Sequence, residues 1–115
     1  MTGAPDRITA GPDGNLWFTE PFPFENRIGR ITPAGVVAEF QLTAPGGPRD
    51  IVAGSDGNLW FTKFDSEQLS TITPDGIVTD VQKARGGPWG IGRAADGSIW
   101  VTLITGNRVG QFSVR

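Results

Sequence analysis

Short apolar runs alternate along this chain with turns rich in glycine, proline and aspartate. The run Leu16-Trp17-Phe18 returns as Leu59-Trp60-Phe61 and again as Ile99-Trp100-Val101, each time five residues after the start of the same phrase. A strand that is apolar at consecutive positions is expected to be covered on both faces. A period of about 40 residues is typical of propellers and helical arrays. The pattern therefore favours sheets stacked side by side.

One full repeat predicts four short strands, at residues 50–53, 58–62, 69–73 and 77–81. Asp-Gly and Pro-Asp-Gly turns separate them, and glycine accepts the positive φ that tight hairpins require. Structural roles are therefore expected for the turn glycines Gly14, Gly57 and Gly97. We predict an all-β fold of β-propeller blades, each a four-stranded antiparallel meander.

The repeats predict about three blades, at residues 5–43, 48–84 and 88–115, in a single propeller segment. The third lacks its fourth strand, which gives eleven strands and an incomplete ring. Closed propellers have about 4 to 8 blades, so the apolar flanks of the outer blades need a cover. We therefore expect a homo-oligomer, most simply a dimer with six blades. The repeated tryptophans Trp17, Trp60 and Trp100 are expected in the core between blades.

Composition excludes several classes of function. The chain contains no histidine and no cysteine, so a Ser-His-Asp triad, a histidine-metal site and a cysteine nucleophile are excluded within it. The net charge is −2 and the basic residues are scattered, which argues against a nucleic-acid partner. No apolar run is long enough to cross a membrane, and no secretion signal is recognisable. We expect a soluble, cytoplasmic protein.

The ends of a blade differ in how strictly they repeat. The first-to-second and third-to-fourth turns are nearly constant, whereas the other connections diverge, and variable loops on a repeated scaffold are the natural place for a ligand. An aromatic pair on a proline-stiffened loop, two basic residues and one tryptophan outside the repeat position lie at this end. These ligand-binding candidates are Phe22, Phe24, Arg49, Lys63 and Trp89. The aromatic pair could equally fold back onto its own blade.

Acidic residues near the same end supply oxygen ligands of the kind that Mg²⁺ or Ca²⁺ prefers. The metal-site candidates are Glu20, Glu25, Asp65 and Glu67. Solvated loop carboxylates without a metal are the commoner alternative.

Three phrases, beginning at Gly11, Asn26 and Gly46, closely resemble the repeat of the streptogramin B lyases, also called virginiamycin B lyases. The resemblance covers nearly the whole chain. It implies a seven-bladed propeller that opens cyclic depsipeptide antibiotics by Mg²⁺-dependent C–O elimination at the ester. The family's lyases depend on catalytic histidines, which this chain lacks, so no catalytic role is assigned to any residue.

Two functional hypotheses remain. One is a subunit or segment of a streptogramin-lyase-like enzyme that opens a small cyclic peptide with Mg²⁺. The other is a non-enzymatic module that assembles with itself and presents the variable loops to a ligand, and the absence of histidine favours it. A gluconolactonase-like or NHL-like propeller is a third relative that the pattern allows.

Overall fold

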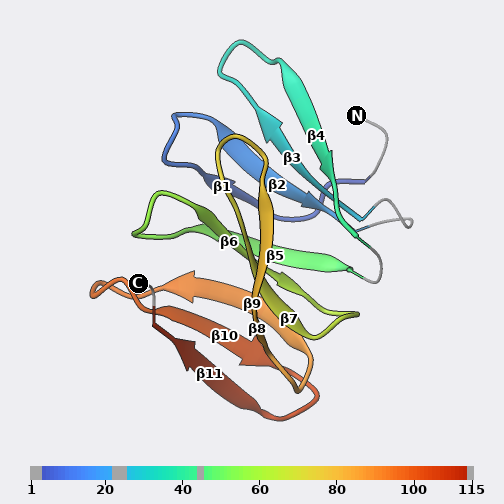
Figure 1. The fold of residues 1–115 in the computed structure, drawn as a ribbon, viewed down its shortest axis with the longest axis vertical. Coiled ribbons are helices and arrows are strands. Elements are labelled where there is room, and N and C mark those ends of the chain that lie inside the picture. Colours follow the sequence, from blue (N-terminus) through green and yellow to red (C-terminus); the bar gives the residue numbers. More distant parts are fainter. Residues whose placement is uncertain (1–3, 22–25, 44–45, 114–115) are drawn as a thin grey trace.

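A computed structural model describes residues 4–21, 26–43 and 46–113, which form three antiparallel sheets that follow one another across the molecule (Figure 1). Blade 1 consists of β1 (Ile8–Ala10), β2 (Leu16–Glu20), β3 (Arg27–Ile31) and β4 (Val37–Gln41). Blade 2 consists of β5 (Pro48–Ala53), β6 (Leu59–Lys63), β7 (Gln68–Ile72) and β8 (Val78–Lys83). Blade 3 consists of β9 (Pro88–Arg93), β10 (Ile99–Leu103) and β11 (Arg108–Phe112).

This architecture confirms the predicted fold class. Within the described residues there are eleven strands in sheets of four, four and three, each a simple meander, and the ring is not closed. The first strand of each blade contacts the first strand of the next, so β1, β5 and β9 lie at the inner edge of the segment. The described part of the chain has no helix of the length and hydropathy needed to cross a membrane.

The turn glycines occupy the conformation that the sequence requires of them. Gly14, Gly57 and Gly97 have φ between +83° and +88° in the hairpins that precede β2, β6 and β10. A Cβ atom disfavours this left-handed region, so glycine removes a local strain at the same point of every blade.

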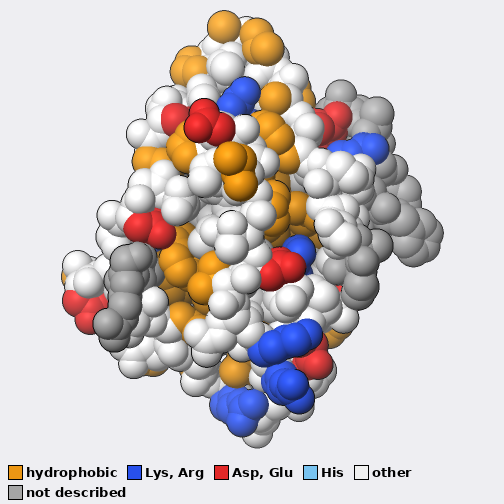
Figure 2. All heavy atoms as spheres, in the orientation of Figure 1, with side chains coloured by type: hydrophobic (Ala, Val, Ile, Leu, Met, Phe, Trp, Pro, Cys, Tyr) orange, Lys and Arg blue, Asp and Glu red, His pale blue; other side chains and the backbone are white. Residues whose placement is uncertain are grey.

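Two apolar cores lie between the blades, and hydrophobic side chains are visible in the bands between the sheets (Figure 2). The first joins Trp17 and Ile28 of blade 1 to Leu59 and Phe61 of blade 2. The second joins Trp60 of blade 2 to three strands of blade 3. Neighbouring residues of β6 therefore enter different cores, which explains why Leu59, Trp60 and Phe61 are all apolar.

Trp100 departs from the expected position. Trp17 is 0% exposed and Trp60 is 5% exposed, whereas Trp100 is 41% exposed. In the single chain Trp100 does not lie in an inter-blade core, because this side chain projects from the face of blade 3 that no described blade covers. Its neighbours Ile99 and Val101 point the other way, into the second core.

Candidate functional site

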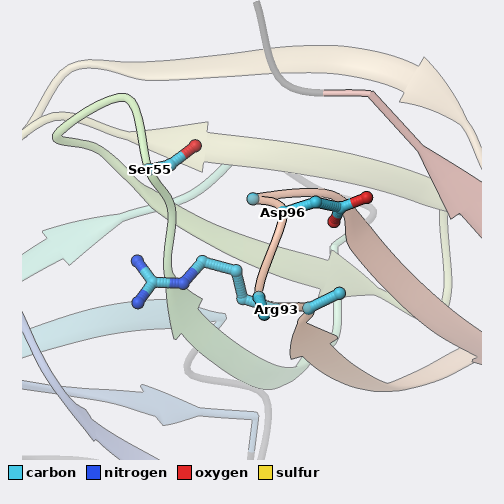
Figure 3. Close-up of a pocket in the computed structure, with 6 residues that line it drawn as sticks. Ser55, Arg93 and Asp96 are labelled. Carbon is cyan, nitrogen blue, oxygen red and sulfur yellow. The ribbon is translucent and has the colours of Figure 1, made fainter.

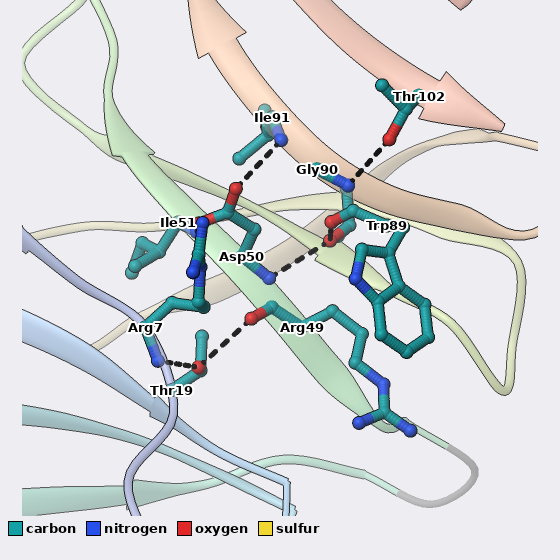
Figure 4. A network of polar contacts seen from close by, with 10 residues as sticks. Arg7, Thr19, Arg49, Asp50, Ile51, Trp89, Gly90, Ile91 and Thr102 are labelled. Atoms are coloured by element: carbon teal, nitrogen blue, oxygen red, sulfur yellow. Dashed lines mark hydrogen bonds and ion pairs between the residues drawn. The ribbon is translucent and has the colours of Figure 1, made fainter. Parts of the chain in front are cut away.

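Threonines at the ends of β2 and β6 join successive blades through the same kind of hydrogen bond, which Figure 4 shows for Thr19 and Arg49. Thr19 Oγ1 donates to the carbonyl oxygen of Arg49 at 3.2 Å, and Thr62 Oγ1 donates to the carbonyl oxygen of Trp89 at 2.8 Å. The same hydroxyls accept from backbone N–H groups of their own blades, those of Arg7 and Asp50, each at 3.2 Å. Each threonine thus connects the inner strands of two successive blades.

A β-bulge makes this connection possible. The register of β5 against β6 shifts between Pro48 and Ile51, so that Arg49 and Asp50 oppose the single residue Thr62. A bulge interrupts the backbone ladder and turns a peptide group out of it. Here the threonine side chain accepts the displaced N–H of Asp50, and the carbonyl group of Arg49 is turned toward the preceding blade.

Asp50 ties three blades together at the inner edge (Figure 4). One of its carboxylate oxygens lies 3.6 Å from Nε of Arg7 in blade 1. The other accepts from the backbone N–H of Ile91 in blade 3 at 3.0 Å. The side chain of Asp50 is 17% exposed, whereas that of Arg7 is 62% exposed, so solvent screens the ion pair and the hydrogen bond to Ile91 is the better protected contact. Asp50 is therefore a structural residue of the blade joints.

Glu67 acts as a loop latch, which means that its side chain holds the following interblade loop by a hydrogen bond to the backbone. Asn26, Glu67 and Asn107 occupy the same position in the three repeats and have φ of +51° to +52°. Glu67 Oε2 accepts from the backbone N–H of Gly86 at 2.9 Å, as Asn26 Oδ1 accepts from that of Gly47 at 3.1 Å. Hydrogen bonds from the N–H groups of Gly86 and Gly87 lower the pKa of Glu67.

The other predicted metal ligands do not gather around Glu67. Glu20 is fully buried at the end of β2, and Asp65, in the same loop as Glu67, lies against Gly47 of the loop before β5. Among the described residues, no group of three or more acidic side chains is placed to hold a metal ion. The described residues therefore do not fit a magnesium site by themselves. Glu25, the fourth candidate, lies outside the described residues.

Arg49, Phe64 and Trp89 form a cluster at the end of the variable loops. The guanidinium carbon of Arg49 lies 4.5 Å from the centre of the Trp89 ring and 5.7 Å from that of Phe64. The two rings meet edge to face, with centroids 5.3 Å apart. Cation–π contacts of this kind contribute about 0.5–2 kcal/mol according to their desolvation. The cluster holds an arginine and a half-exposed indole in fixed positions.

Lys63 is occupied within its own blade. Its side chain is 3% exposed, and its Nζ atom lies 2.8 Å from Oδ1 of Asp80 on β8. Ser70 Oγ donates to the same oxygen at 2.6 Å. Burial by itself raises the pKa of Asp80, but the hydrogen bonds from Lys63 and Ser70 outweigh it and hold the pKa below its usual value. Lys63 is thus engaged in an ion pair within its own blade.

Phe22 and Phe24, the remaining ligand-binding candidates, lie outside the described residues. Of the candidates that are described, the structure brings Arg49 and Trp89 together. It adds Phe64, which the sequence did not single out. The signal that could have found Phe64 was its place directly after β6, in the variable connection next to Lys63.

The constant end of the blades carries a hollow of about 390 Å³ beside the turns of blades 2 and 3 (Figure 3). Ser55, Arg93 and Asp96 line it. Asp96 is engaged by Ser98, whose backbone N–H and hydroxyl both donate to Oδ1 and lower the pKa of Asp96. The equivalent aspartates of the other turns bond to the indole nitrogens of Trp17 and Trp60, so this end organises the turns.

The meander blades, the inner first strands and the repeated threonine joints define an open segment of a β-propeller. The sequence profile of the Virginiamycin B lyase family matches residues 1–115. The chain therefore belongs to the virginiamycin B lyase family. No curated protein sequence matches it significantly.

Solved structures agree with this assignment. Virginiamycin B lyase from Staphylococcus aureus is 38% identical with a TM-score of 0.89, and the match covers 96% of this chain and 38% of that one. A catalytically inactive variant of the Staphylococcus aureus lyase with quinupristin is 35% identical with a TM-score of 0.82, covering 97% of this chain and 42% of that one. The chain thus spans about two fifths of the lyases that it matches.

A gluconolactonase from Xanthomonas campestris shares the fold. It is 16% identical with a TM-score of 0.73, and the match covers 86% of this chain and 34% of that one. At this identity the similarity concerns the propeller architecture alone.

Proposed function

We propose that this chain supplies three consecutive blades of a virginiamycin B lyase-type propeller and has no lyase activity of its own. The observation that carries the proposal is the threonine joint, which recurs between blades 1 and 2 and between blades 2 and 3. The surfaces that form these joints recur on the outer faces of blades 1 and 3. The chain is therefore a propeller-forming unit whose outer faces suit further blades.

The chemistry of the described residues supports a scaffold. The chain has no histidine to serve as a general base. Its acidic candidates at the variable end are engaged or separated: Glu67 latches two loops, and the described carboxylates form no cluster for a metal ion. No step of the family reaction is therefore assigned to them.

Ring opening tests this proposal directly. The folded chain is incubated with quinupristin and Mg²⁺, and the products are followed by liquid chromatography and mass spectrometry. Full-length virginiamycin B lyase is the positive control, and parallel samples contain EDTA. We expect the antibiotic to remain cyclic with this chain. Opening that EDTA abolishes would show that the three blades suffice for catalysis and would overturn the proposal.

A ligand-binding role is the second candidate, and the Arg49 cluster is the observation that favours it. A positioned guanidinium and a half-exposed indole offer a charge-assisted donor and an apolar surface to one peptide ring. Titration with quinupristin should quench the tryptophan fluorescence, and Trp89→Leu should remove the binding. Equal binding by Trp89→Leu and by the wild type would exclude this cluster as the site.

A further inference from the structure

The outer face of blade 3 repeats the face with which blade 2 joins blade 3. Thr102 Oγ1 accepts from the backbone N–H of Gly90 at 2.8 Å, as Thr62 Oγ1 accepts from that of Asp50. In blade 2 the hydroxyl of Thr62 also donates a hydrogen bond to the carbonyl oxygen of Trp89 in the next blade. The hydroxyl of Thr102 can donate a hydrogen bond in the same way, and it lies on the face that no described blade covers.

Apolar side chains surround Thr102 in the pattern of an internal joint. Trp100 holds the position of Trp60, and Val109 pairs with Thr102 as Leu69 pairs with Thr62. Trp60 and Leu69 are buried against blade 3. By contrast, Trp100 is 41% exposed and Val109 is 59% exposed. Trp100 and Val109 are therefore apolar like the residues of a buried joint, but in the single chain no blade packs against them.

The outer face of blade 1 carries the complementary half. Ile8 is 62% exposed and Leu16 is 45% exposed. Beside them is a hollow of about 310 Å³, lined by Pro5, Asp6, Arg7, Ile8, Phe18 and Ile31. Four of the residues on this face, Ile8, Leu16, Phe18 and Ile31, hold the positions of Ile51, Leu59, Phe61 and Ile72, which pack against Trp17 in the first core.

The backbone acceptor of the joint is present on this face as well. The N–H of Asp6 donates to the carbonyl oxygen of Thr19, and the N–H of Thr19 donates to the carbonyl oxygen of Arg7. The backbone N–H of Arg7 donates to the hydroxyl of Thr19. Asp6 and Arg7 thus oppose Thr19 as Arg49 and Asp50 oppose Thr62. The carbonyl oxygen of Asp6 is the equivalent of the one that Arg49 offers to the preceding blade.

We propose that a second copy of this chain docks its blade 1 on blade 3 of the first, placing Trp100 over the hollow beside Ile8 and Thr102 Oγ1 on the carbonyl oxygen of Asp6. The argument is continuity with two joints that the chain already contains, and it rests on the proposed function as a propeller-forming unit. Two such contacts, related by two-fold symmetry, give six blades, within the range of closed propellers.

Two variants with one damaged face each test this contact by complementation. Trp100→Glu places a charge on the blade 3 face, and Leu16→Glu places one on the blade 1 face. Both side chains are partly exposed, so each variant should fold. Ile77→Glu is the matched control, because Ile77 is 63% exposed in a turn of the middle blade, both of whose faces are covered. Circular dichroism verifies folding, and light scattering after size exclusion measures the mass.

We expect the wild type and Ile77→Glu to be dimers with a mass of twice 12.2 kDa, and each face variant alone to be a monomer of 12.2 kDa. A mixture of the two face variants should recover a dimer, since one undamaged contact remains possible between them. Thr102→Val should raise the dissociation constant roughly tenfold through loss of the hydroxyl donor.

A folded wild type that stays at 12.2 kDa at all concentrations would overturn the inference, as would a dimer that neither face variant disrupts. Larger assemblies would overturn closure by two copies. These outcomes leave the proposed function standing as long as quinupristin stays cyclic. Opening of the quinupristin ring by this chain would overturn the proposed function, whether the chain is a monomer or a dimer.

Discussion

Thr62 Oγ1 donates a hydrogen bond of 2.8 Å to the carbonyl oxygen of Trp89, so that a side chain of one blade completes the backbone of the next. The acceptor is available because the bulge opposite Thr102 turns a peptide group of β9 out of its own ladder. The repeat therefore encodes the joint in two parts, a threonine at the end of the second strand and a bulge at the start of the following blade.

Replacing Thr62 by valine should lower the free energy of unfolding by about 1–3 kcal/mol. The substitution preserves shape but leaves two partly buried backbone groups, the N–H of Asp50 and the carbonyl of Trp89, without their side-chain partner. Urea-induced unfolding followed by circular dichroism measures the loss. Thr79→Val on the exposed strand β8 is the control and should change stability by less than about 0.5 kcal/mol. Equal effects of the two variants would contradict the role of Thr62.

The repeat predicted the blades well because local signals determine them. Asp-Gly turns fix the hairpins, and apolar runs fix the strands, so the sheets could be derived from short stretches of sequence. The burial of the tryptophans could not be derived in this way. Trp17, Trp60 and Trp100 have the same local phrase, but whether an indole is buried depends on the blade that packs against it.

The candidate site was predictable only in part for a similar reason. Sequence variation placed Arg49 and Trp89 at the same end, and the structure brings them together with Phe64. It also separates residues that share this end. Lys63 pairs with Asp80 from a strand two positions away in the sheet, a contact that no local pattern reveals. The joint made by Thr62 was not predictable either, because its acceptor lies in the following blade.

Gly57→Ala should destabilise the chain by about 1–2 kcal/mol through backbone strain alone. Gly57 has φ of +85°, and an added Cβ would meet no atom within 4 Å, so steric contact does not contribute. Gly57→Asn is the matched variant, since asparagine tolerates the left-handed region better and should recover part of the loss. Thermal unfolding of the three proteins measures the order. Alanine as stable as glycine would show that the turn relaxes.

Glu67→Gln and Glu67→Ala should separate a loop latch from a metal ligand. Glutamine keeps a carbonyl oxygen that can accept from the N–H of Gly86, whereas alanine removes the acceptor. We therefore expect the melting temperature to fall in Glu67→Ala and to fall less in Glu67→Gln, with the same values in Mg²⁺ and in EDTA. A stabilisation by Mg²⁺ that both variants lose would assign Glu67 to a metal site.

Asp80→Asn should lower stability at neutral pH by about 1 kcal/mol and should matter less in acid. The carboxylate accepts from Lys63 and Ser70, but it is 44% exposed, so solvent screens the pair and limits its contribution. The folded chain has the lower pKa for Asp80, which means that folding favours the ionised form. This stabilisation is complete above the unfolded pKa of about 3.9 and is lost as the pH falls through the folded value.

Urea unfolding at several pH values between 7 and 3 measures this difference. The gap between the wild type and Asp80→Asn should be constant from neutral pH to about pH 5 and should narrow below about pH 4. Asp75→Asn in the exposed turn before β8 is the control for removing one negative charge. If the stability difference between the wild type and Asp80→Asn stayed the same in acid, it would not depend on the charge of Asp80. The side chain would then stabilise the fold through packing and not through its ion pair with Lys63.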